Sequence, residues 1–88
     1  MRRVVITGIG VISPIGNTVA EVEASLRAGR SGIVAAPEYA ELGFRSQIHG
    51  KPQITLEDHI DKRDLRFMGP GAAYNFLAMQ QAIADSGL

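Results

Sequence analysis

The first apolar stretch of the chain is short and unbroken. Val4, Val5 and Ile6 stand in a row, and glycine, serine and proline punctuate the stretch from Gly8 to Gly16. Consecutive β-branched residues, rather than residues alternating with polar ones, are typical of a strand covered on both faces. The pattern therefore predicts a buried strand over Arg3 to Thr7 that leads into a glycine-rich turn.

A helix is expected next, with clear signals at both ends. Thr18 and Glu21 have the spacing of a capping box, in which the hydroxyl accepts from a backbone N–H and the carboxylate reaches back. Gly29 suits the left-handed conformation that ends many helices. Between these signals lies an apolar stripe at helical spacing, made of Val19, Val22 and Leu26.

The C-terminal part predicts one short helix and one long one. Asp61 is the expected N-cap of a short helix over 61–68, which a Gly-Pro-Gly run at 69–71 ends. The long helix is expected from about Ala72 to Ser86, with Gly87 as its end signal. Three apolar residues share one of its faces: Phe76, Met79 and Ile83.

The middle of the chain is weakly patterned. Short strands or extended loops are expected at Ile33-Val34, Phe44 to Ile48 and Gln53-Ile54, and Thr55 to Asp58 resembles a further helix start. A single strong strand leaves backbone groups unpaired along both of its edges. We therefore expect residues 1–88 to be the first part of a larger α/β protein, without an internal domain boundary and poorly folded alone.

Composition narrows the classes of partner. Nine basic residues balance nine acidic ones, so net charge favours neither nucleic acid nor an anionic membrane as a partner. No apolar run approaches the roughly 20 residues of a membrane span, and a cytoplasmic protein is the expectation. The sequence contains no cysteine, so none of its residues offers a thiolate as a nucleophile or a metal ligand.

The glycine-rich turn is one candidate site, for a nicotinamide dinucleotide. Gly8 and Gly10 fit the first two positions of the dinucleotide fingerprint, but Ser13 occupies the third, and Pro14 has no N–H to offer a phosphate. We expect no cofactor here and interpret the glycines as a sharp turn packed against neighbouring backbone. A nicotinamide-dependent oxidoreductase remains an alternative enzyme class.

The same residues resemble a known family. VVITGIGVISPIGN is similar to the N-terminal strand and turn of β-ketoacyl-acyl-carrier-protein synthases, and EVEASLRAGRSGI is similar to their first helix and its exit. GFRSQIHG and IDKRDLRFMGPGAAYNFLAMQQAIADSGL resemble the type I enzymes, although SPIGNTV is closer to type II. The resemblance covers essentially all 88 residues.

This resemblance implies a fold and a reaction. The fold is thiolase-like, with two similar halves layered αβαβα and paired as a homodimer, and this chain would form the first part of the first half. The reaction is a decarboxylative condensation in fatty acid synthesis, in which a cysteine takes the acyl chain and two histidines assist decarboxylation.

The same resemblance places the catalytic groups outside this segment. The family's cysteine and both histidines lie beyond residue 88. His49 and His59 match no catalytic motif, and Ser13 and Ser31 have no orienting base nearby in sequence. We expect no catalytic, cofactor-binding or metal-binding residue here, and no condensing activity from these residues alone.

Binding chemistry is expected on the short helix that precedes the Gly-Pro-Gly run. Lys62, Arg63 and Arg66 lie within about one turn of each other, which by itself is typical of a solvated helix face. In type I condensing enzymes the matching positions are basic and receive the acidic acyl carrier protein, and Arg45 matches a further basic position. Asp64, among the three cations, departs from the family pattern.

Three hypotheses about function follow. The resemblance implies a condensing-enzyme segment that binds acyl carrier protein through the four cations named above. The rivals are the nicotinamide-dependent oxidoreductase, which requires nucleotide affinity at Gly8 to Gly16, and a small interaction module without catalysis, which requires that the 88 residues fold alone.

Overall fold

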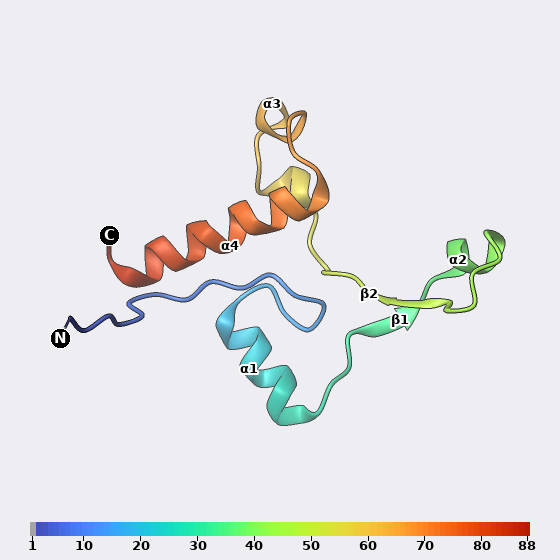
Figure 1. Cartoon of the computed structure of the whole chain (residues 1–88), viewed down its shortest axis with the longest axis horizontal. Helices are drawn as coiled ribbons and strands as arrows, with labels where there is room; N and C mark the ends of the chain where they lie inside the picture. Colours follow the sequence, from blue (N-terminus) through green and yellow to red (C-terminus); the bar gives the residue numbers. More distant parts are fainter. Residues whose placement is uncertain (1) are drawn as a thin grey trace. The chain divides into compact units, whose positions relative to one another are not determined.

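A computed structural model describes residues 2–88, which contain both helices and strands. They form two compact units. Residues 2–12 with Ile54–Leu88 make the first, here named the helical unit, and Ser13–Gln53 make the second, the hairpin unit. The elements in chain order are α1 (Val19–Ala28), β1 (Ile33–Ala35), α2 (Pro37–Glu41), β2 (Ile48–Gly50), the 3₁₀ turn η1 (Leu56–Asp58), α3 (Lys62–Leu65) and α4 (Pro70–Ser86) (Figure 1).

The long helix α4 organises the helical unit. Ala73 and Leu77 of α4 are buried together with Ile60, which follows η1. Five partly buried apolar residues pack against this cluster: Ile12, Ile54, Leu56, Leu65 and Met68. The core of the unit is therefore small and lies near the N-terminal end of α4.

The apolar stripe expected on α4 is not its buried face. Phe76, Met79 and Ile83 are all substantially exposed, whereas the neighbouring Ala73 and Leu77 are buried. Apolar spacing alone identifies a face that can be covered, but it does not say what covers it. Among residues 2–88, the N-terminal segment packs instead against the side of α4 that carries Ala78 and Ala82.

The N-terminal segment runs antiparallel to α4, alongside it in Figure 1. A Cβ added at Gly8 would meet the carbonyl oxygen of Ala82, and one added at Gly10 would meet that of Ala78. The amide of Ile9 donates to Oδ2 of Asp85 at 3.0 Å, and the amide of Val11 donates to Oε1 of Gln81 at 3.1 Å. The glycines are needed because the two backbones approach too closely for a side chain.

The strand expected over Arg3 to Thr7 is absent from the described structure, so that prediction is wrong here. Val4 is 94% exposed and Ile6 is 84% exposed, and no strand within residues 2–88 pairs with this segment. A strand needs a hydrogen-bonded neighbour, and an unbroken β-branched run also needs cover on two faces. The described residues supply neither requirement.

The first helix of the hairpin unit, α1, confirms the predicted end signals. Oγ1 of Thr18 accepts from the amide of Glu21 at 3.2 Å, and Gly29 ends the helix with φ at 68°. The Thr18 hydroxyl also donates to the Glu21 carboxylate at 3.2 Å, so this carboxylate engages the side chain of the cap. The buried hydroxyl of Ser25 donates to the carbonyl of Ile15 at 2.6 Å and ties α1 to the preceding turn.

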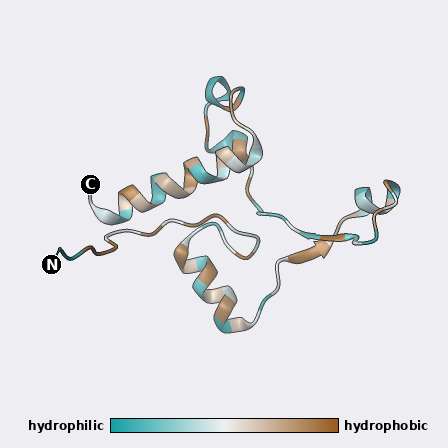
Figure 2. Ribbon diagram, in the orientation of Figure 1, coloured by the Kyte–Doolittle hydropathy of each residue, from teal (hydrophilic) through white to brown (hydrophobic). Residues whose placement is uncertain are grey.

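The rest of the hairpin unit is a two-stranded antiparallel sheet with a short helix inserted between its strands. Ile33 pairs with Gly50, and Ala35 pairs with Ile48. Three segments were expected to be short strands or extended loops. Ile33-Val34 lies in a strand, the 44–48 segment is strand only at Ile48, and Gln53-Ile54 is loop. The helix α2 was not predicted, although Pro37 at its first turn is a recognised start signal. β1 is apolar throughout (Figure 2) and exposed.

Two short elements, η1 and α3, precede α4 in the chain. The helix start expected at Thr55 to Asp58 is the 3₁₀ turn η1. Asp61 caps α3 as predicted, because its Oδ1 accepts from the amide of Arg63 at 3.1 Å. α4 begins at Pro70, slightly earlier than expected, and ends at Gly87 with φ at 80°. No helix in residues 2–88 is long and apolar enough to cross a membrane.

Candidate functional site

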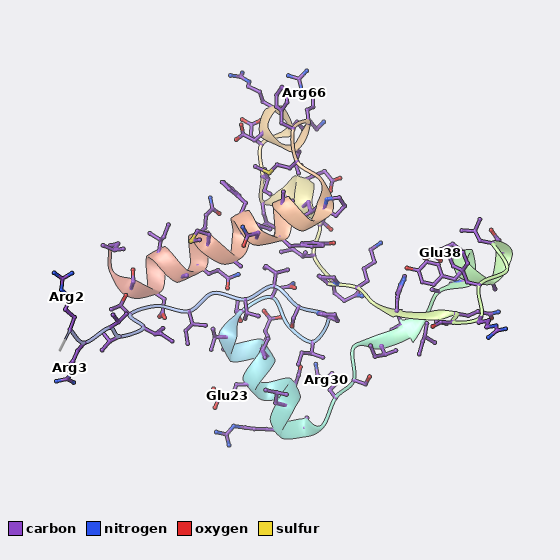
Figure 3. The ribbon with its side chains drawn as sticks, in the orientation of Figure 1. Arg2, Arg3, Glu23, Arg30, Glu38 and Arg66 are labelled. Carbon is purple, nitrogen blue, oxygen red and sulfur yellow. The ribbon has the colours of Figure 1, made fainter. Side chains whose placement is uncertain are left out.

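The cations of α3 form the basic surface, defined here as Lys62, Arg63 and Arg66. All three residues are exposed, and Figure 3 shows Arg66 projecting outward at the turn that ends α3. Within the described part of the chain, none of the three side chains forms a salt bridge or a side-chain hydrogen bond. The Asp61 cap fixes the helix that carries them, while their charged groups remain available to a partner.

Asp64 does not neutralise the basic surface by direct contact. Its carboxylate is exposed, and it makes no ion pair with a cation among residues 2–88. The departure from the family pattern therefore lowers the net charge of α3 without closing off any one of its cations.

An exposed aromatic ring borders the basic surface. Phe67 directly follows Arg66 and is 86% exposed. The guanidinium carbon of Arg66 lies 6.0 Å from the centre of the Phe67 ring, at the outer limit of a cation–π contact. A large apolar side chain in solvent beside unpaired cations is a combination that a protein partner can cover.

A hollow opens between η1 and the basic surface, and we name it the α3 hollow. Its volume is about 480 Å³, and it is lined by Glu57, Lys62, Arg63, Leu65 and Arg66. Leu65 is half-buried and packs against the core cluster, so it forms a fixed apolar part of the wall. No periodic pattern in the sequence indicates that Glu57 and Leu65 share a hollow with the cations.

Arg45, the fourth predicted binding residue, belongs to the hairpin unit. It lies between α2 and β2, and its side chain is exposed. The basic surface belongs to the helical unit. Participation of Arg45 in the same site stays a prediction.

The two histidines lie in different environments. His49 is half-buried in the hairpin unit, where its ring meets that of Tyr39 edge-on at 5.3 Å and its Nδ1 lies 3.8 Å from Oε1 of Glu38. His59 is exposed after η1. Residues 2–88 contain no group of three histidine, cysteine, aspartate or glutamate side chains placed to hold a metal ion. Packing accounts for the position of His49.

Three backbone donors at the end of the glycine-rich turn, over residues 13–16, are occupied internally. The amides of Ser13 and Gly16 donate to each other's carbonyls at 2.9 and 3.2 Å, and the amide of Ile15 donates to Oγ of Ser13 at 3.3 Å. Pro14 has no amide hydrogen. A phosphate-binding loop needs several free N–H groups that converge on one point, and residues 13–16 do not provide them.

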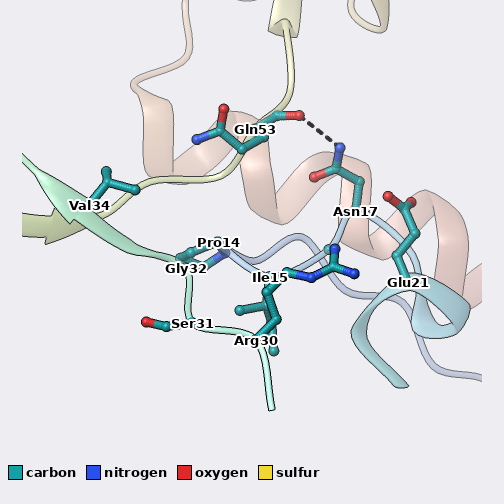
Figure 4. Close-up of a pocket in the computed structure, with 10 residues that line it drawn as sticks. Pro14, Ile15, Asn17, Glu21, Arg30, Ser31, Gly32, Val34 and Gln53 are labelled. Carbon is teal, nitrogen blue, oxygen red and sulfur yellow. Dashed lines mark hydrogen bonds between the residues drawn. The ribbon is translucent and has the colours of Figure 1, made fainter. Parts of the chain in front are cut away.

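A second hollow, of about 410 Å³, lies beside this turn within the hairpin unit (Figure 4). Arg30 and Glu21 both line it, and Nδ2 of Asn17 donates to the carbonyl of Gln53 at 2.9 Å across one side. The two side chains of opposite charge leave the hollow without a preference for an anionic or a cationic ligand. Its chemistry does not favour a nucleotide.

Comparisons with known proteins give the family. A family model described as the N-terminal domain of beta-ketoacyl synthase matches residues 1–88. Over 88 residues, covering all of this chain, 3-oxoacyl-acyl-carrier-protein synthase 1 of Haemophilus influenzae is 52% identical and its Escherichia coli namesake is 49% identical. The corresponding synthase 2 of Vibrio cholerae is 40% identical over 99% of the chain.

These matches confirm the recognised family and its type I character. Identity is higher to the relatives named synthase 1 than to those named synthase 2. The chain spans 22% of the length of the two synthase 1 relatives, and 21% of the Vibrio cholerae protein. The nicotinamide-dependent oxidoreductase and the small interaction module find no support in these matches. The chain belongs to the beta-ketoacyl synthase family, and its residues match that family's N-terminal domain.

Proposed function

We propose that the protein to which this segment belongs is a type I condensing enzyme of fatty acid elongation. The match to the beta-ketoacyl synthase N-terminal domain over the whole chain is the observation that carries the proposal. In that family an acyl group passes from carrier protein to a cysteine thiolate, and malonyl-carrier protein loses carbon dioxide. The resulting carbanion attacks the acyl thioester and releases the thiolate.

The segment contributes structure and binding to this reaction, while the nucleophile and the two histidines come from elsewhere in the protein. The layered thiolase-like fold gives the N-terminal segment a role, because it provides a sheet in which Val4 to Ile6 can pair and be covered. The exposure of this apolar run in the described residues supports that role. We also propose that the intact enzyme is cytoplasmic and forms a homodimer.

The basic surface is the part of the segment that docks acyl carrier protein. The names of the synthase 1 relatives specify carrier-protein substrates, and an acidic carrier presents carboxylates that suit three unpaired cations. Exposed charge pairs mainly steer the encounter and fix its register. Arg45 adds a fourth cation to the proposed site.

Reversing the charge of the basic surface tests the docking role. In the intact enzyme, Lys62→Glu/Arg63→Glu/Arg66→Glu replaces attraction by repulsion and is expected to weaken carrier binding by on the order of several kcal/mol. KM for acyl-carrier substrate rises, and reactivity with a small thioester is retained. The loss shrinks as salt is raised, because ions screen both signs of charge.

A matched variant controls for net charge. Arg3→Glu/Arg30→Glu/Lys51→Glu changes the net charge equally, at exposed cations outside α3 that form no salt bridge in the described residues. We expect a much smaller change in KM from this control. If both triple variants bind carrier protein equally well at low salt, the α3 cations are a solvated face and the docking assignment fails.

A further inference from the structure

The short helix α2 of the hairpin unit has few contacts of its own to stabilise it. It spans five residues, none of which is buried, and its N-cap residue, Ala36, makes no side-chain capping hydrogen bond. A helix of this length is not stable in water by itself, because so few backbone bonds do not offset the cost of nucleation. The contacts between α2 and the neighbouring strands therefore decide how often it is formed.

Tyr39 makes several of these contacts. Its half-buried ring meets the ring of His49 on β2 edge-on, with the ring centres 5.3 Å apart, and is tilted against the ring of Phe44 at 5.6 Å. The carbonyl of Tyr39 also accepts from the amide of Phe44 at 2.9 Å. Edge-on and tilted arrangements are favourable for aromatic rings. His49 is thus a point at which α2 attaches to β2.

A carboxylate of α2 lies beside the same histidine. Oε1 of Glu38, which is labelled in Figure 3, lies 3.8 Å from Nδ1 of His49. The two side chains carry opposite charges only when His49 is protonated. Histidine is the side chain whose charge ordinarily changes between about pH 5 and 8, whereas a glutamate carboxylate ordinarily stays ionised over that range. The contact therefore becomes an ion pair as the pH falls.

No other charged group in the described residues forms an ion pair with His49. Two titratable side chains of α2 face it, those of Glu38 and Tyr39, and a tyrosine phenol ordinarily stays neutral over this pH range. Its cross-strand partner on β1 is the apolar Val34. The remaining charged residues of α2, of the loop after it and of the end of β2 are exposed and form no ion pair within residues 2–88: Glu41, Arg45 and Lys51.

We propose that Glu38 and His49 form a pH-sensitive latch that holds α2 against the strand β2. At low pH the ion pair adds to the ring contact of His49 with Tyr39, and the ion pair is lost as the pH rises. The His49 side chain is 22% exposed and the Glu38 side chain is 57% exposed, so the latch has the strength of an exposed pair. It changes how often α2 opens, and it depends on no step of the condensation.

Amide hydrogen exchange of the intact protein tests the latch, read by mass spectrometry on peptides from residues 33–50. The amides of Ala36, Tyr39 and Phe44 report opening, because they donate to backbone carbonyls of the same unit at 2.7, 3.0 and 2.9 Å. After correction for the chemical exchange rate at each pH, protection is expected to be about two- to fivefold higher at pH 5.5 than at pH 8, the range of one exposed ion pair.

Substitutions at both ends of the pair assign this gain. His49→Phe keeps a ring that can meet Tyr39 but cannot be protonated, and Glu38→Gln removes the carboxylate. Both variants are expected to match wild-type protection at pH 8 within about twofold and to lose the gain at pH 5.5. The double variant is expected to lose no more at pH 5.5 than either single variant, as residues in contact do in a double-mutant cycle.

Glu41→Gln is the matched control. It removes the same charge from an exposed residue of α2 that forms no salt bridge in the described residues, and it is expected to keep the gain at pH 5.5. The comparison among variants decides the test, because other groups of the intact protein also titrate.

Two results would overturn the latch. In the first, Glu38→Gln and His49→Phe keep the gain, and His49 is then a packing residue only. In the second, Glu41→Gln loses the gain as well, and the effect then belongs to the total charge of α2. If the unfolding temperature shows that His49→Phe damages the protein, Glu38→Gln against Glu41→Gln still decides. Loss of the gain at Glu38 and not at Glu41 supports the latch.

Discussion

In the N-terminal segment the backbone at Gly8 and Gly10 lies directly against α4, whereas α3 in the same unit holds three cationic side chains in solvent without an internal partner. The first region uses residues without side chains because any side chain would collide. The second uses long side chains that stabilise nothing inside the unit. The first therefore serves the fold, while the second is the proposed docking surface for a partner.

This difference predicts opposite responses to substitution. Changes in the N-terminal segment or in buried anchors are expected to lower the free energy of unfolding. Changes on the basic surface are expected to leave unfolding unaltered and to affect only binding. Three substitutions test the contrast, in order of decreasing effect.

Gly10→Ala is expected to have the largest effect. The added Cβ would meet the carbonyl of Ala78 and would lie 2.7 Å from the backbone nitrogen of Ala82, so the segment must move away from α4. That movement strains the Val11–Gln81 hydrogen bond. Overpacking of this kind costs about 1–3 kcal/mol or more, measured by denaturant unfolding of the intact protein.

Gly71→Ala is the matched control for this substitution. It lies in the first turn of α4, and an added Cβ there has no atom within 4 Å. Alanine in a helix restricts the unfolded chain and is expected to stabilise by about 0.4–1 kcal/mol. Equal stability of the Gly10 and Gly71 variants would show that the segment does not lie against α4 in the intact protein.

Ser25→Ala is expected to have an intermediate effect. The substitution removes the 2.6 Å hydrogen bond from the buried Ser25 hydroxyl to the carbonyl of Ile15 and leaves that carbonyl without this donor. Losing such a partner costs about 1–3 kcal/mol. Ser46→Ala, at an exposed serine of the same unit whose hydroxyl forms no hydrogen bond in the described residues, is expected to stay within about 0.5 kcal/mol of wild type. Equal urea midpoints for the two variants would contradict the role of Ser25 as an anchor.

The local signals in the sequence predict some of these features and not others. Thr18, Gly29, Asp61 and Gly87 mark helix ends correctly, because caps depend on one residue and its immediate backbone. The Arg3 to Thr7 strand was wrong for the described residues because pairing depends on a neighbour that no local pattern supplies. The stripe of Phe76, Met79 and Ile83 is exposed for a similar reason, because spacing identifies an apolar face but not the segment that covers it.

For the candidate site, too, the sequence predicts one part and misses another. Helical spacing placed Lys62, Arg63 and Arg66 together, the resemblance implied their binding role, and the structure adds that all three lack ion-pair partners among the described residues. The α3 hollow was not predicted, because Glu57 and Leu65 come from different elements and meet only through the fold. The sequence identifies the charged residues of α3, but the hollow beside them forms only where η1 and α3 meet in the folded chain.

Arg66→Ala is expected to have the smallest effect and is the most direct test of the contrast. The guanidinium has no salt bridge in the described residues, and it lies 6.0 Å from the centre of the exposed Phe67 ring. The free energy of unfolding should therefore match wild type within about 0.5 kcal/mol, as for surface substitutions in general. Carrier-protein affinity should fall by about 0.2–1 kcal/mol, the contribution of one exposed charge pair, and the fall should diminish with added salt. Arg66→Lys keeps the charge and should recover most of the affinity, because steering depends on charge more than on geometry. Calorimetric titration with carrier protein measures the affinities, and denaturant unfolding measures stability. A loss of stability without a loss of affinity would reverse the assignment and make Arg66 a structural residue of α3.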